Sequence, residues 1–89
     1  MISREITIIN KLGLHARAAA KLVSLASTFD SDIRIAKDGK SVNGKSIMGV
    51  MMLAASQNSS ITITANGEDE QAAMNKLEAL VADRFGEES

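Results

Sequence analysis

The sequence predicts an α+β fold in which helices cover one face of a mainly antiparallel sheet. Strand-like and helix-like segments follow one another in the order βαββαβα, and an Asp-Gly turn joins the second and third strands as a tight hairpin. The 89 residues, 45% of them hydrophobic, suffice for one small domain over residues 1–89 with a core of its own.

The first half of the chain contains three predicted strands and one helix. Isoleucines at alternate positions predict the first strand over residues 6–9. Apolar residues then recur at helical spacing from Ala16 to Phe29, which predicts the first helix. Strict alternation predicts the second strand over residues 32–37, and the hairpin turn leads into a third strand over residues 40–42.

The second half contains two helices and the last strand. A short apolar helix follows Ser46, and alternation over residues 61–64 predicts the fourth strand. The final helix follows an Asn-Gly turn, has an acidic first turn that suits the helix dipole, and carries an apolar stripe that runs to Arg84. Residues 86–89 are expected to fray.

The short helix after Ser46 holds more apolar residues than one face can bury. We expect Val50 and Leu53 to lie in the core and Met48 and Met51 to be exposed. Exposed methionines suit a surface that fits several partners in turn. Burial of the whole set is the alternative.

Composition excludes several classes of function. The chain has one histidine and no cysteine, so neither a metal site nor a disulfide framework is supported, and no cofactor is implied. The net charge of −1 and the absence of Trp and Tyr argue against nucleic-acid binding. No signal-like or membrane-spanning segment is present, which predicts a cytoplasmic protein without membrane insertion.

The only histidine, His15, stands where the first helix is about to begin. Histidine is a poor helix N-cap, so stability alone does not explain it. The positive end of a helix dipole disfavours a charged imidazolium, and the free N–H groups there can bind an anion such as a phosphoryl group. Arg17 adds a positive charge suited to phosphate oxygens. A lone histidine is otherwise usually structural or merely exposed, and no carboxylate that could orient this one is evident.

Two further motifs have competing interpretations. Residues 39–46 match the P-loop pattern G-x4-G-K-S, but half of that segment is predicted to be hairpin and strand, so ATP binding is disfavoured. Ser46 can be the N-cap of the short helix or a modification site, because a helix start tolerates a phosphate well. The residues alone favour the cap.

The chain closely resembles the HPr family, the histidine-containing phosphocarriers of the bacterial phosphoenolpyruvate phosphotransferase system. The resemblance spans nearly the whole chain and is most specific at residues 10–17 and 43–49. It implies an open-faced βαββαβα sandwich with a four-stranded antiparallel sheet and three helices on one face. It also implies that His15 accepts a phosphoryl group on Nδ1 from enzyme I and passes it to enzyme IIA-type proteins, as a relay rather than a stand-alone enzyme. Ala16 and Arg17 would bind the phosphate.

The resemblance further implies a docking surface and a regulatory serine. The docking surface consists of Leu14, Ala20, Lys21, Lys45, Ile47, Met48 and Met51. Ser46 is similar to the serine that a dedicated kinase, HPr kinase/phosphorylase, modifies in some bacteria. The main alternative is therefore a regulatory binding module that Ser46 phosphorylation directs to a target such as a transcriptional regulator. A monomer is expected in either case.

The chain departs from the commonest family pattern at several positions. Ala18 stands where most relatives have proline, and Ser24, Ser27 and Gly49 stand where many have lysine. The positively charged rim of the surface that would meet an acidic partner thus carries fewer lysines. This resembles the nitrogen-related branch of the system, which is a second alternative.

Overall fold

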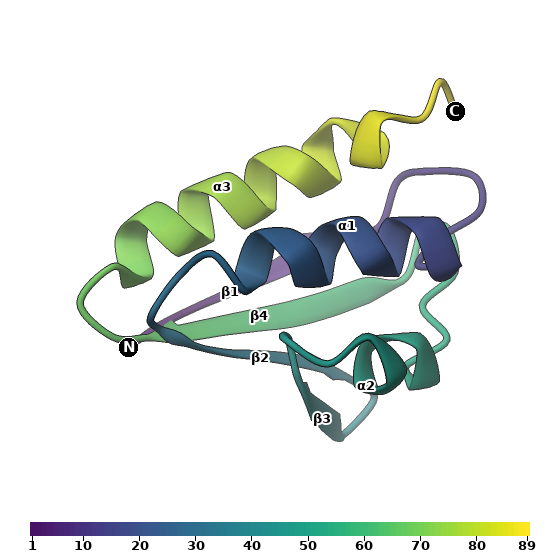
Figure 1. Cartoon of the computed structure of the whole chain (residues 1–89). Helices are drawn as coiled ribbons and strands as arrows, with labels where there is room; N and C mark the ends of the chain where they lie inside the picture. The colour runs from purple at the N-terminus through teal and green to yellow at the C-terminus, as the bar shows by residue number, and fades with distance from the viewer.

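Four strands form one antiparallel sheet, and three helices lie on one of its faces (Figure 1). The computed structural model describes residues 1–89. The strands are β1 (Ile2–Thr7), β2 (Asp32–Lys37), β3 (Lys40–Asn43) and β4 (Ser60–Asn66), in the spatial order β1-β4-β2-β3. The helices are α1 (Ala16–Ala26), α2 (Ile47–Met52) and α3 (Glu70–Ala82), followed by the 3-10 turn η1 (Arg84–Gly86). The predicted fold class is confirmed.

The register of the sheet separates a buried face from an open one. Ile35 lies opposite Ile63 in the β2–β4 ladder, and both side chains are completely buried beneath the helices. Arg34 lies opposite Thr64 on the other face, where no helix covers the sheet. Because successive side chains of a strand point to opposite faces, this register places the isoleucines of the central strands in the core.

The first strand differs from its prediction. It spans residues 2–7 rather than 6–9, and it pairs with β4 along its whole length. Arg4 occupies an inward-facing position between Ile2 and Ile6 and pairs with Glu78 of α3. Because this position is charged, the alternation of apolar and polar residues is interrupted in the sequence. Ile8 is buried but lies beyond the strand, where its N–H donates to the Ser59 carbonyl at 2.8 Å.

The hairpin between β2 and β3 decides against the P-loop. Asp38 and Gly39 have φ values of 50° and 84°, the left-handed conformation that tight two-residue hairpin turns require. Residues 40–43 then form β3, so half of the motif is bound into a sheet ladder. Its backbone N–H groups therefore cannot form a phosphate cradle.

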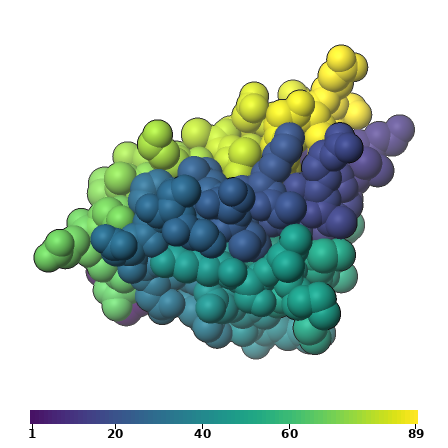
Figure 2. Space-filling view, in the orientation of Figure 1, coloured from purple at the N-terminus to yellow at the C-terminus, as the bar shows by residue number.

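A buried aromatic side chain and backbone hydrogen bonds hold the segment after α3, so the expected fraying is wrong for Gly86 and Glu87. Arg84, Phe85 and Gly86 all have positive φ, and this left-handed turn folds the chain back toward the start of α1. Phe85 is completely buried, and Lys21 of α1 donates from Nζ to its carbonyl at 2.6 Å. Figure 2 shows the yellow C-terminal residues packed against the dark-blue start of α1.

None of the helices combines the length and the apolar character that crossing a membrane requires.

Candidate functional site

His15 is the N-cap residue of α1. Its backbone is extended, and its carbonyl accepts the first helical hydrogen bond, from Ala19 N at 2.8 Å. Its side chain makes no capping bond and is 29% exposed. The ring is therefore reachable from solvent, and no side chain caps the first amides of α1, which remain available to an anion.

The loop before His15 is held in place by backbone contacts. Gly13 has a φ of +65°, and a Cβ there would lie 2.4 Å from the Ala55 carbonyl oxygen. Leu14 N donates to that same oxygen at 2.8 Å, and buried Asn10 donates from Nδ2 to the Gly13 carbonyl at 2.8 Å. Glycine is thus needed at residue 13 for both conformation and space.

A carboxylate orients the His15 ring, although sequence reasoning found none. Glu87 contacts Nε2 of His15 through Oε2, and its Oε1 accepts a bond from Asn10 Nδ2 at 3.0 Å. These hydrogen bonds, of which the one from His15 has the largest effect, hold the pKa of Glu87 below its usual value. The carboxyl group is therefore ionised at neutral pH. An ionised carboxylate only accepts hydrogen bonds, so Nε2 of the neutral ring carries the proton. Nδ1 then keeps its lone pair, and it makes no hydrogen bond within the chain.

The missed carboxylate lies 72 residues from His15 in sequence. Its only signal is Phe85, an apolar residue just beyond the end of the last helical stripe. That stripe suggests Arg84 on the core side, whereas the left-handed turn exposes Arg84 and buries Phe85.

Ala16 and Arg17 begin α1 and are exposed. Arg17 makes no hydrogen bond or ion pair with the rest of the chain, so its charge is free to meet an anion. It also lines a shallow groove of about 510 Å³ beside α1, with Ala20, Lys21, Ser24, Leu25, Thr28 and Leu80. His15 lies outside this groove, at the open end of the helix.

The predicted docking surface is only partly assembled. Leu14 is buried in the core, so including it was wrong: the hydrogen bond that its N–H donates to the Ala55 carbonyl holds the loop with this side chain inward. Ala20 is exposed on α1. Ile47, Met48 and Met51 are exposed on α2 while Val50 and Leu53 are buried, as expected, and Met52 is exposed as well.

The two lysines of the docking surface bind backbone carbonyls within the chain. Lys21 bonds the Phe85 carbonyl, and Lys45 Nζ donates to the Phe29 carbonyl at 2.7 Å. Their charges are therefore fixed in position by these hydrogen bonds. Each ammonium retains further donors for a partner.

Ser46 acts as the N-cap of α2. Its Oγ accepts a bond from Gly49 N at 3.2 Å, and its carbonyl accepts one from Val50 N at 3.0 Å. The capping interpretation is confirmed.

No group of three or more His, Cys, Asp or Glu side chains is placed to hold a metal ion.

Comparison with known proteins agrees with this geometry. A family model described as the PTS HPr component phosphorylation site matches residues 2–83. The chain belongs to the HPr family. Membership gives it the role of a phosphocarrier of the phosphotransferase system.

Members of the HPr family are similar to the chain over nearly its full length. Phosphocarrier protein HPr of Cupriavidus necator is 58% identical over 87 residues, which cover 98% of each chain. Phosphocarrier protein NPr of Shewanella violacea is 44% identical, over 99% of this chain and 97% of its own. The crystal structure of HPr from Thermoanaerobacter tengcongensis matches with a TM-score of 0.97 at 48% identity, and both chains are fully covered.

Replacing Glu87 by glutamine is expected to lower the fraction of His15 rings that carry the proton on Nε2. A glutamine amide can donate as well as accept, so it no longer selects one ring form. Nitrogen-15 NMR of the imidazole measures the two forms directly. Glu88→Gln, an exposed neighbour, is the matched control, and an unchanged spectrum in Glu87→Gln would contradict this role.

The same contact is expected to depend on pH. Because the pKa of Glu87 is lowered in the folded protein, the contact stabilises the C-terminal segment above the ordinary value of 4.5. That contribution is lost as the pH falls through the lowered pKa. The amide shift of residue 87 in an NMR titration reports the change, and Glu87→Gln should remove it.

Proposed function

We propose that this chain accepts a phosphoryl group from phosphorylated enzyme I on Nδ1 of His15 and passes it to enzyme IIA-type proteins. The observation that carries the proposal is the single imidazole at the uncapped start of α1, with Nε2 engaged by Glu87 and Nδ1 free. Arg17, exposed and unpaired two residues further on, supplies the positive charge that an incoming phosphoryl group needs.

Transfer requires positioning and charge stabilisation rather than a general base. The Nδ1 lone pair attacks phosphorus, the bond from phosphorus to the donor breaks, and Arg17 and the amides of Ala16 and Arg17 hold the phosphoryl oxygens. Glu87 accepts the Nε2 proton in a hydrogen bond and balances the positive charge that develops on the ring. Delivery to the acceptor is the same step in reverse.

Incubation with enzyme I and phosphoenolpyruvate tests this function. The chain should gain one phosphoryl group that is labile in acid and stable in base, as phosphohistidine is. Omission of enzyme I should leave it unmodified. A label that survives acid would assign the phosphoryl group to another residue.

Ser46 is the proposed regulatory site, a substrate for HPr kinase/phosphorylase. A phosphate there would add negative charge to the start of α2 beside Ile47 and Met48, so it would act on docking directly. The regulatory-module alternative rests on this serine, with a transcriptional regulator as target. Capture of such a partner by phosphorylated chain, undiminished by His15→Ala, would favour that alternative.

Ser46→Ala is expected to destabilise the fold by about 1 kcal/mol, because it removes the hydroxyl that caps Gly49 N. Ser46→Asp keeps a capping oxygen and adds charge, so it should retain stability and slow acceptance from enzyme I several-fold. Chemical denaturation and initial transfer rates measure the two effects. Equal stability of the alanine variant and the parent would contradict the cap.

The proposed carrier acts as a monomer. Relatives differ in this respect: a crystal structure of Crh from Bacillus subtilis, 48% identical with a TM-score of 0.75, is described as a dimer with a swapping domain. Here β1 pairs with β4 of its own chain, and Arg4 ties it to Glu78. Light scattering should therefore give the monomer mass, and a stable dimer of the unaltered chain would contradict this proposal.

A comparison of transfer rates can decide whether the chain serves the sugar-specific or the nitrogen-related branch of the system. Similarity to the NPr of Shewanella violacea and the reduced basic rim fit the nitrogen-related branch, whereas the more similar relatives are named HPr. Transfer rates to sugar-specific and nitrogen-related IIA proteins would assign the branch.

A further inference from the structure

We propose that the three methionines of α2 form an oxidation-sensitive site, at which conversion to sulfoxides weakens partner docking without unfolding the protein. The inference rests on the proposed function, because α2 carries Ile47, Met48 and Met51 of the docking surface. It assigns a modification to Met48, Met51 and Met52.

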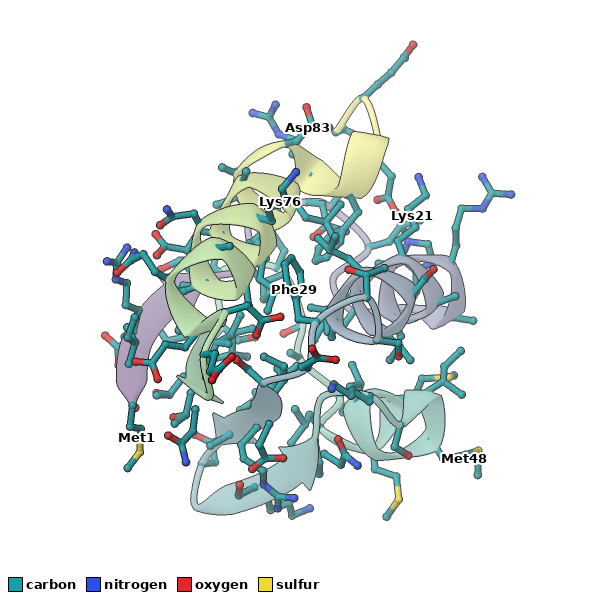
Figure 3. All side chains as sticks on the ribbon, turned by 60° about the vertical axis from the view of Figure 1, so that its left-hand side comes forward. Met1, Lys21, Phe29, Met48, Lys76 and Asp83 are labelled. Atoms are coloured by element: carbon teal, nitrogen blue, oxygen red, sulfur yellow. The ribbon has the colours of Figure 1, made fainter.

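The methionines of α2 are exposed to solvent, whereas the methionine of α3 is not. Met48 and Met52 are 70% and 72% exposed and Met51 is 41% exposed, whereas Met74 is completely buried in the core. The chain has no Cys, Trp or Tyr, so methionines are its most readily oxidised side chains. Met1 is also exposed, but it lies at the opposite end of the molecule from Met48 (Figure 3).

The three side chains share one face of a short helix. Positions 48, 51 and 52 are spaced by three and four residues, so they fall on the same side of α2, and Val50 on the other side anchors the helix in the core. Ile47 extends the apolar surface toward Ser46. Oxidation of this face therefore changes the docking surface and leaves the buried contacts of α2 in place.

The chemistry needs only a two-electron oxidant such as hydrogen peroxide. The thioether sulfur attacks one peroxide oxygen, a sulfur–oxygen bond forms, the oxygen–oxygen bond breaks, and water leaves. The product is a polar sulfoxide, which a thiol-dependent reductase can return to the thioether. A partner that buries a thioether would have to desolvate the sulfoxide instead, so docking becomes weaker.

The full chain is treated with increasing concentrations of hydrogen peroxide, and the added oxygens are located by mass spectrometry of its peptides. The initial rate of phosphoryl acceptance from enzyme I is then measured at a low concentration of the chain, where the rate depends on docking. Met48, Met51 and Met52 should oxidise before Met74. The rate should fall about tenfold, as expected when the apolar burial of one or two methionine tips is lost. Circular dichroism should be unchanged, and methionine sulfoxide reductase should restore the rate.

A triple variant, Met48→Leu with Met51→Leu and Met52→Leu, identifies the residues responsible. Each protein is compared with its own untreated sample, so any change in basal rate cancels. The variant still contains Met1 and Met74, and its rate should not respond to peroxide. An undiminished rate in the oxidised parent, or an equal loss in the variant, would overturn the proposal. Failure of the untreated parent to accept phosphate would instead refute the function itself.

Discussion

His15→Ala is expected to abolish phosphoryl acceptance, with a fall of roughly a thousandfold or more. The chain contains no second histidine, and the amides of α1 and the Arg17 charge can bind a phosphoryl group but cannot form a bond to it. Labelling should therefore fall to the background level of a reaction without enzyme I. Labelling from phosphoenolpyruvate through enzyme I measures the effect.

The substitution should leave the fold intact, because the His15 side chain makes no capping bond and its one contact, with Glu87, involves only the C-terminal segment. Circular dichroism and denaturation verify this, and Ser46→Ala, which removes a cap but no nucleophile, serves as the matched control. Full labelling of His15→Ala would reject His15 as the acceptor. A folded variant without label would separate chemistry from stability.

Phe85→Ala is expected to reduce the free energy of unfolding by about 3–5 kcal/mol, a large part of the stability of a small domain. Phe85 is completely buried, and alanine would leave a cavity between the end of α3 and the rest of the core. Backbone strain changes little, because alanine is as disfavoured at a φ of 55° as phenylalanine is. Urea denaturation gives the value.

Phe29→Ala, at the half-buried second phenylalanine, is the matched control and should cost clearly less. Loss of the Phe85 anchor should also release Glu87, so the His15 ring should resemble that of Glu87→Gln by nitrogen-15 NMR. A change in stability below about 1 kcal/mol would show that the C-terminal turn is not part of the core.

Local signals predicted most of the fold. Strict alternation defined residues 32–37, and the Asp38-Gly39 turn fixed the hairpin, because both patterns depend only on neighbouring residues. The first strand was misplaced because Arg4 occupies an inward position, which only its contact with Glu78 on α3 explains. An edge strand with an inward charge does not show clean alternation.

The sequence singled out His15 and Arg17, which lie together at the start of α1, but it did not reveal Glu87, which contacts the His15 ring. His15 and Arg17 stand out because their types are unusual at a helix start. Glu87 could not be found, because its approach depends on a left-handed turn at two residues that rarely adopt one. Leu14 was misassigned because an apolar residue beside a site can face either way until the Ala55 contact is known.

The open start of α1 has a practical consequence for kinetics. Uncapped amides and an unpaired arginine do not distinguish the transferred group from other oxyanions, so sulfate or inorganic phosphate in a buffer should act as a weak competitive inhibitor. Rates measured in zwitterionic buffers at low ionic strength are therefore the proper reference.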